Sequence, residues 1–194
     1  MVTQVHGAGV VEVAGDERPE VVERIAADAL VTSAPGVALA VRTADCVPVL
    51  LAVEGPGVAR VAAVHAGWRG VVAGVIPAAV LALTAGGLAT TAVRASIGPA
   101  IDGCCFEVHP DVSEALVAAT GRREIVIVRG PGSRPHVDLR RAARWSLLSA
   151  GLLAEHIDLV GPCTRCAASA FHSYRREGGG RGRQLSFVVI SGDA

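Results

Sequence analysis

The fold is decided by two apolar stretches, TADCVPVLLAV (residues 43–53) and VARVAAVHAGWRG (residues 58–70). Each contains a near-continuous run of valine, leucine and alanine, which is typical of a β-strand covered on both faces. Cys46 stands directly before the first run, and His65 follows the second. Because α/β folds place their sites at the ends of buried strands, these two side chains are candidates for chemistry.

The pairing of a thiol with an imidazole allows two interpretations. Sulfur and imidazole nitrogen are the ligands that zinc or copper prefers, but Cys46 and His65 could equally be a nucleophile and its base. His6, in the segment QVHG, is a third candidate. Three protein ligands would leave a fourth position open, as in catalytic rather than structural sites. Asp45, beside Cys46, is a candidate for moving a proton.

Strands and helices are mixed along the chain, which predicts an α/β or α+β layered fold in a single domain covering residues 1–194. Valine-rich segments bounded by glycine or proline predict strands. Helical patterns end in capping residues or glycine. The expected strands are 10–13, 29–32, 37–42, 47–53, 58–65, 93–97, 124–128, 157–160 and 185–190. The expected helices are 16–28 in part, 70–83, 111–119 and 138–150, the last with Asp138 as its N-cap.

Composition excludes several classes of function. Acidic and basic residues balance at 18 each and aromatic residues make up 3%, so neither a basic field nor a stacking platform for nucleic acid is expected. All the basic residues are arginine, which excludes a Schiff-base or P-loop lysine.

The uncharged stretch 71–93 contains glycine and proline and is expected to be a buried helix and turn rather than a membrane span. An odd number of cysteines without a secretory signal predicts a cytoplasmic protein with reduced thiols.

The sequence alone assigns no clear role to the four remaining cysteines or to an arginine- and glycine-rich segment near the C-terminus. Cys163 and Cys166 have the CxxC spacing, but the pair is only half of a zinc ribbon and a redox pair is the weaker interpretation. Cys104 and Cys105 are adjacent and do not complete a familiar pattern, so a loop with two incidental thiols is expected at Cys163 and Cys166. The arginine- and glycine-rich segment 174–184 predicts either a solvated loop or a lid that binds an anion.

Five motifs in order nevertheless resemble one known family. They are QVHG (4–7), RTADCVPVLL (42–51), AAVHAGWRG (62–70), SIGPAIDGCCFEV (96–108), and CT followed by FHSYRREG (171–178). The chain resembles the laccase-domain family, whose members are called polyphenol oxidase, purine nucleoside phosphorylase or peptidoglycan editing factor. The combination of HAGWRG with TADC is specific to that family, and the resemblance covers nearly the whole chain.

The resemblance implies a layered α/β/α fold with mixed sheets and a metal site formed by His6, Cys46 and His65. It implies zinc as the cofactor, with copper possible for the oxidase activity. The substrates implied are small molecules, namely a purine nucleoside with phosphate, or adenosine for deamination, with no nucleic acid or membrane as partner. In that interpretation Arg69 is the first candidate to hold phosphate, and Arg42 and Arg175 follow.

Three alternatives stay open beside a zinc-dependent purine nucleoside enzyme. They are a copper polyphenol oxidase, a thiol hydrolase of peptidoglycan editing with Cys46 as nucleophile and His65 as base, and a metal-binding protein without catalysis. The family normally carries a further segment before QVHG, whereas this sequence begins almost at that motif. We therefore expect substrate binding to be affected more than metal binding.

Overall fold

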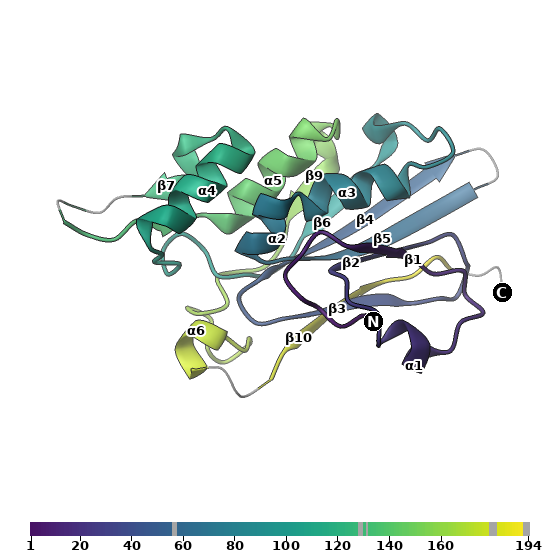
Figure 1. The fold of residues 1–194 in the computed structure, drawn as a ribbon, viewed down its shortest axis with the longest axis horizontal. Coiled ribbons are helices and arrows are strands. Elements are labelled where there is room, and N and C mark those ends of the chain that lie inside the picture. The colour runs from purple at the N-terminus through teal and green to yellow at the C-terminus, as the bar shows by residue number, and fades with distance from the viewer. Residues whose placement is uncertain (56–57, 128–129, 131, 179–181, 192–194) are drawn as a thin grey trace.

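The computed structural model describes residues 1–55, 58–127, 130, 132–178 and 182–191, and its centre is a mixed six-stranded sheet. The strand order is β1-β2-β5-β4-β6-β9, with parallel pairs at both edges and antiparallel pairs between them (Figure 1). The strands are β1 (Val10–Glu12), β2 (Ala29–Thr32), β4 (Val47–Gly55), β5 (Val58–Ala66), β6 (Arg94–Ile97) and β9 (Ile157–Leu159).

The central strands are buried on both faces, as their apolar runs predict. In β2, Ala29 and Val31 pack into one hydrophobic core, whereas Leu30 between them packs into a second. In β5, Val64 belongs to the first core and Ala63 to the second. Because successive side chains of a strand point to opposite faces, an uninterrupted apolar run is what two cores require.

The helices that cover one face of the sheet enclose the first core (Figure 1). They are α2 (Trp68–Ala73), α3 (Val75–Leu83), α4 (Pro110–Thr120) and α5 (Leu139–Ser149). The sequence predicts one helix over 70–83, but the structure divides it at Gly74. That residue has φ of 85° and ends α2 in the left-handed conformation, which glycine adopts without steric cost. At α5 the predicted cap is confirmed, because the Asp138 side chain accepts a hydrogen bond from the Arg141 amide.

The second core lies between the opposite face of the sheet and an antiparallel ribbon of β3 (Leu39–Thr43) and β10 (Gln184–Val188). The short helix α1 (Pro19–Val22) lies on this side of the molecule (Figure 1). A separate pair is formed by β7 (Val126–Ile127) and β8 (His136–Val137). Short 3-10 turns occur at Thr90–Ala92, Arg123–Ile125 and Ala154–His156.

The predicted mixed α/β class with mixed sheets is confirmed, and the differences are local. The polar segment 16–28 is helical only over α1, and the predicted strand 124–128 is strand only at β7, with residue 128 outside the described part. The arginine- and glycine-rich segment contains one helical turn, α6 (Tyr174–Glu177), which the Ser173 side chain caps. Among the described residues, no helix is long and apolar enough to cross a membrane.

Candidate metal and substrate site

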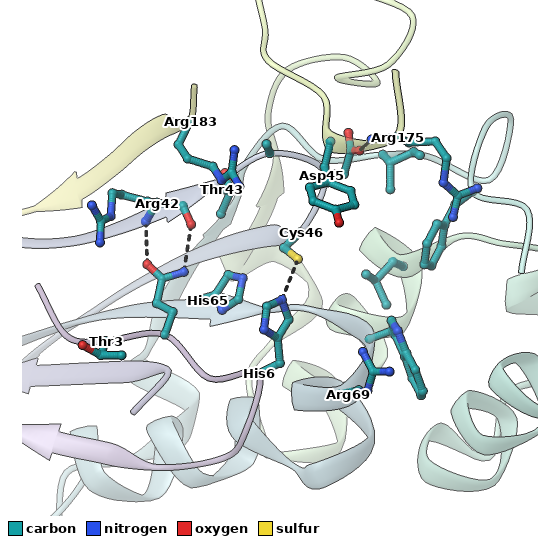
Figure 2. A pocket seen from close by; sticks show the side chains of 17 residues that line it. Thr3, His6, Arg42, Thr43, Asp45, Cys46, His65, Arg69, Arg175 and Arg183 are labelled. Carbon is teal, nitrogen blue, oxygen red and sulfur yellow. Dashed lines mark hydrogen bonds between the residues drawn. The ribbon is translucent and has the colours of Figure 1, made fainter. Parts of the chain in front are cut away.

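The pairing of β4 with β5 brings the two opening candidates together. In this antiparallel pair Val47 lies opposite Ala66 and Pro48 lies opposite His65. The residue just before β4 and the last residues of β5 therefore share one edge of the sheet, which places Cys46 beside His65 (Figure 2). Cys46 and His65 are nineteen residues apart in sequence, and they meet because they stand at the two open ends of the β4–β5 hairpin.

His6 reaches the same point from the loop before β1. Its Nε2 atom lies 3.8 Å from the Cys46 sulfur, and its ring meets the His65 ring edge-on with centroids 4.8 Å apart. The His6 backbone has φ of 61°, an uncommon conformation for a residue with a side chain. The fully buried Asp28 carboxylate holds this conformation, because it accepts hydrogen bonds from the amides of His6 at 2.9 Å and Gly7 at 2.6 Å.

Asp28 also fixes the orientation of His65. Its Oδ1 atom lies 2.8 Å from Nδ1 of His65, and both side chains are buried. Burial lowers the pKa of His65, with the nearby His6 acting in the same direction and the Asp28 hydrogen bond opposing it. The neutral ring then carries its proton on Nδ1 and keeps the Nε2 lone pair for another partner. A histidine held by a carboxylate in this way is the usual arrangement of a metal ligand.

The three side chains form a donor set suited to a metal ion. The ligand atoms of His6, Cys46 and His65 all lie within 4.8 Å of one another. Two imidazole nitrogens and a sulfur match zinc, and three ligands leave a position for substrate or water. Burial, together with the charges of Asp45 and Asp28, raises the pKa of the Cys46 thiol to about 12. Without a bound cation Cys46 is therefore a protonated thiol, which argues against an activated nucleophile.

Gly67 leaves room for these ligands to approach each other. A β-carbon added there would lie 2.7 Å from Cδ2 of His6 and 3.1 Å from the Cys46 sulfur. Any side chain at position 67 would therefore push apart two members of the donor set. This close approach gives the first glycine of HAGWRG a role at the site.

The donor set lies in a cavity of about 780 Å³, a volume typical of small-ligand sites. Its walls combine cationic and aromatic side chains (Figure 2). The arginines that line it are Arg42, Arg69, Arg175 and Arg183, and the aromatic residues are Trp68, Phe106 and Tyr174. The structure thus brings the three predicted ligands and the three predicted arginines, Arg42, Arg69 and Arg175, into one pocket.

Asp45 lines the cavity and is the centre of a hydrogen-bond network. Its carboxylate accepts hydrogen bonds from the Thr164 hydroxyl at 2.6 Å, the Ser173 hydroxyl at 3.0 Å and the Arg175 amide at 2.7 Å. The Asp45 backbone has φ of 84°, which the surrounding contacts must stabilise. Both carboxylate oxygens are thus engaged in joining the TADC corner to two distant segments of the chain.

The arginines differ in how their side chains are held. The Arg175 guanidinium donates to the Glu107 carbonyl oxygen at 2.9 Å, and the Arg69 guanidinium lies 4.5 Å from the centroid of the Trp68 ring. Arg42 is fixed through its backbone, which exchanges two hydrogen bonds of 2.8 Å with the Gln4 side chain. Arg69 and Arg42 therefore keep exposed guanidinium groups at the cavity wall.

Several residues of the site were not identified from the sequence. Asp28 is an acidic residue directly before the apolar run Ala29–Val31 of a fully buried strand, and that position is the available signal. Thr164 and Ser173 belong to the CT and FHSYRREG motifs, but nothing in the sequence predicts that their hydroxyl groups donate hydrogen bonds to Asp45. The expectation of incidental thiols also needs correction, because the structure gathers Cys104, Cys105, Cys163 and Cys166 into one cluster.

Comparison with known proteins gives the family. A family model described as multi-copper polyphenol oxidoreductase laccase matches residues 1–191. The chain is a laccase-domain protein. It is 39% identical over 174 residues to "Adenosine deaminase RL5" from an unknown prokaryotic organism, covering 89% of this chain and 65% of that protein. It is also 44% identical over 177 residues to purine nucleoside phosphorylase SCO2081 of Streptomyces coelicolor, covering 90% and 68%.

Solved structures share the fold. The crystal structure of YlmD from Geobacillus stearothermophilus matches with a TM-score of 0.88 and 33% identity, over 98% of this chain and 73% of that one. The Bacillus licheniformis protein YfiH matches with a TM-score of 0.89 and 28% identity, over 97% and 73%. This laccase-domain chain spans about two thirds of the length of the curated relatives it matches.

Proposed function

We propose that the protein is a zinc-dependent purine nucleoside enzyme, with phosphorolysis as its main reaction. The observation that carries the proposal is one cavity in which a two-histidine, one-cysteine donor set adjoins exposed arginines and aromatic rings. The relatives named purine nucleoside phosphorylase and adenosine deaminase support the same class of substrate.

The cavity wall suits both parts of the substrate pair. A purine presents a flat aromatic face, and Trp68, Phe106 and Tyr174 supply rings against which it can stack. Phosphate needs cationic donors, and Arg69 and Arg42 offer guanidinium groups that bind phosphate through paired N–H donors. Since the chain contains no lysine, a side-chain cation that binds the anion has to be arginine or protonated histidine.

In phosphorolysis, a phosphate oxygen forms a bond to the anomeric carbon of the ribose while the bond from that carbon to the purine nitrogen breaks. The electron pair of that bond leaves with the base, which takes up a proton. We assign Arg69 to hold phosphate in line with this carbon and the aromatic side chains to orient the base. His6, Cys46 and His65 would hold zinc, which supplies Lewis acidity when bound.

The hydrogen bonds of Asp45 define its role in this proposal. A proton-transfer role was expected from the sequence, but the carboxylate is already engaged by Thr164, Ser173 and the Arg175 amide. We therefore assign Asp45 the positioning of α6, which carries Tyr174 and Arg175 to the cavity. Its loss would act through those two residues.

Adenosine deamination is the second candidate, because one relative is named an adenosine deaminase. It needs water and a bound purine but no phosphate, so the arginines would be dispensable for it. A copper oxidase fits less well. Among the described residues only the His6, Cys46 and His65 group offers histidine ligands, whereas a laccase uses several coppers.

The test separates these reactions by their products. Zinc-loaded protein is incubated with adenosine, inosine, guanosine or methylthioadenosine, with and without phosphate, and the products are separated by chromatography. The proposal expects free base only when phosphate is present, and none from His65→Ala. Conversion of adenosine to inosine without phosphate would favour deamination instead. No product from any nucleoside by fully zinc-loaded protein would contradict both.

A further inference from the structure

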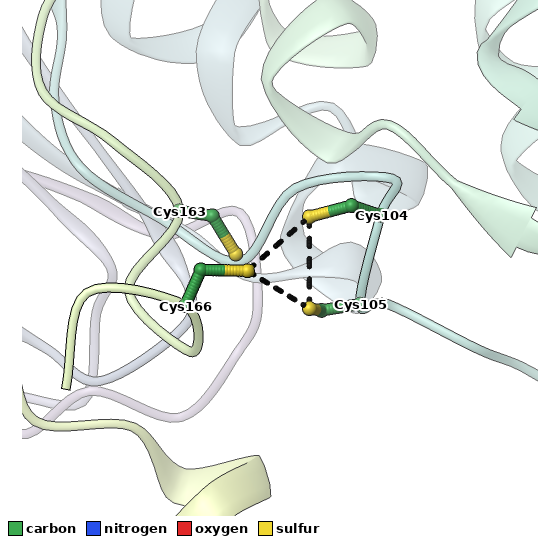
Figure 3. A group of neighbouring side chains, drawn as sticks. All are labelled: Cys104, Cys105, Cys163 and Cys166. Carbon is green, nitrogen blue, oxygen red and sulfur yellow. Dashed lines mark hydrogen bonds between the residues drawn. The ribbon is translucent and has the colours of Figure 1, made fainter.

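Four of the five cysteines lie in one cluster (Figure 3), and none of the four lines the cavity. Cys104 and Cys105 lie in the loop that follows β6, and Cys163 and Cys166 lie in the loop that follows β9. Because β6 and β9 are neighbouring parallel strands, both loops leave the sheet at the same edge. A bridge between Ala100 and Cys163 continues the pairing and brings the two cysteine pairs together.

The spacing of the sulfur atoms matches the edges of a tetrahedron. The Cys104 and Cys105 sulfurs are 3.6 Å apart, and they lie 3.7 Å and 3.4 Å from the Cys166 sulfur. The sulfurs of all four cysteines lie within 4.8 Å of one another. Four sulfurs bound to zinc at about 2.3 Å are separated by about 3.8 Å. A disulfide needs sulfurs at about 2.05 Å, well below these distances.

We propose that Cys104, Cys105, Cys163 and Cys166 bind a second zinc ion, at a structural site. Four cysteine ligands fill the tetrahedral coordination of zinc and leave no position for substrate. The surroundings suit the negative charge of four thiolates. The Asp102 amide donates to the Cys163 sulfur at 3.5 Å, and the Arg165 guanidinium interacts with Cys105.

The ion would hold together a loop that lines the substrate cavity and a second loop that supports the cavity wall through Asp45. Phe106, directly after Cys105, lines the cavity, and Thr164, directly after Cys163, donates to Asp45. Arg176 of α6 donates to the carbonyl oxygens of Thr164 and Arg165 at 2.9 Å. Zinc at the cysteine cluster would therefore fix the position of one cavity wall without contacting substrate. The site itself does not depend on which reaction the cavity catalyses.

Metal content per chain tests the proposal without an activity assay. Zinc is measured by elemental analysis in protein purified under reducing conditions, for wild type, for His6→Ala with His65→Ala, and for Cys104→Ala with Cys166→Ala. We expect about two zinc ions in wild type and about one in each double variant. Ser169→Ala, on the exposed loop after Cys166, is the matched control and should keep both ions.

Cobalt substitution covers the case in which the cysteine variant does not fold. The histidine double variant keeps all four cysteines of the cluster. When loaded with cobalt(II), it should show the intense visible bands and sulfur-to-metal charge transfer of a tetrahedral four-thiolate site. A histidine variant that binds neither zinc nor cobalt would overturn the proposal. So would two cluster cysteines that resist alkylation until a reductant is added, because they would form a disulfide.

Discussion

The buried carboxylate of Asp28 lies 2.8 Å from Nδ1 of His65, and it also accepts hydrogen bonds from the backbone of the loop that carries His6. Asp28 therefore orients His65 by contacting the His65 side chain, and it orients His6 by contacting the His6 main chain. The arrangement of the three candidate ligands depends on Asp28, although Asp28 is not itself a member of the donor set.

Asp28→Asn should weaken zinc binding at this site by about 10- to 100-fold, the usual effect of losing the group that orients a ligand histidine. The amide keeps the shape but loses the charge and turns one acceptor into a donor. Zinc affinity is measured by competition with a chelating dye. Glu12→Gln, which removes a carboxylate from the ion pair with Arg60 elsewhere, is the control and should bind zinc normally. Equal affinity in both variants would show that Asp28 does not orient His65.

Gly67→Ala should lower zinc content at the first site while the protein stays folded. The new methyl group would lie 2.7 Å from the His6 ring, and the loop that carries His6 must move to relieve the contact. The measurement is zinc per chain together with a thermal unfolding curve. Gly130→Ala, where an added β-carbon meets nothing within 4 Å, is the matched control. Full zinc content in Gly67→Ala would contradict the close packing of the donor set.

Cys46 should react slowly with iodoacetamide once zinc has been removed. Its pKa is raised to about 12, so the thiolate, which is the reactive form, accumulates only as the pH rises toward that value. At pH 8 the reaction should be at least about a hundred-fold slower than that of a free thiol, and it should speed up about tenfold for each pH unit. Peptide mass spectrometry separates Cys46 from the clustered cysteines. Rapid alkylation with a plateau near neutral pH would instead support the thiol hydrolase.

Arg69→Ala should raise the KM for phosphate by about 10- to 100-fold, which corresponds to the loss of a charge-assisted hydrogen bond of about 1.5–3 kcal/mol. The KM for the nucleoside should change much less, because the rings that face the base remain. Initial rates are measured over a range of phosphate concentrations. Arg94→Ala removes an exposed arginine of β6 outside the cavity lining and serves as the control. An unchanged phosphate dependence in Arg69→Ala would remove Arg69 from the proposed role.

The sequence predicted the sheet well because each central strand has a strong local signal. The apolar runs at 47–53 and 58–65 require burial on both faces, and the hairpin between them places Cys46 beside His65. His6 was included through ligand chemistry and family resemblance. The position of His6 depends on its contact with Asp28. No local sequence pattern reveals that these two segments of the chain meet.

The cysteine cluster shows the limit of spacing arguments more clearly. A CxxC pair and an adjacent pair, separated by 57 intervening residues, match no zinc motif when they are considered along the chain. They meet because β6 and β9 pair in parallel, and that pairing is a property of the whole sheet. The hydrogen bonds of Asp45 show the same limit, because their donors Thr164 and Ser173 lie more than a hundred residues away in sequence.

The most direct test of the central claim follows the fate of phosphate. Zinc-loaded wild type and His65→Ala are each mixed with inosine and phosphate, ribose 1-phosphate is followed by phosphorus NMR, and hypoxanthine is measured by chromatography. The account predicts that wild type forms ribose 1-phosphate in equal amount to the hypoxanthine released, and that His65→Ala forms neither. Hypoxanthine without ribose 1-phosphate, or equal turnover by His65→Ala, would contradict it.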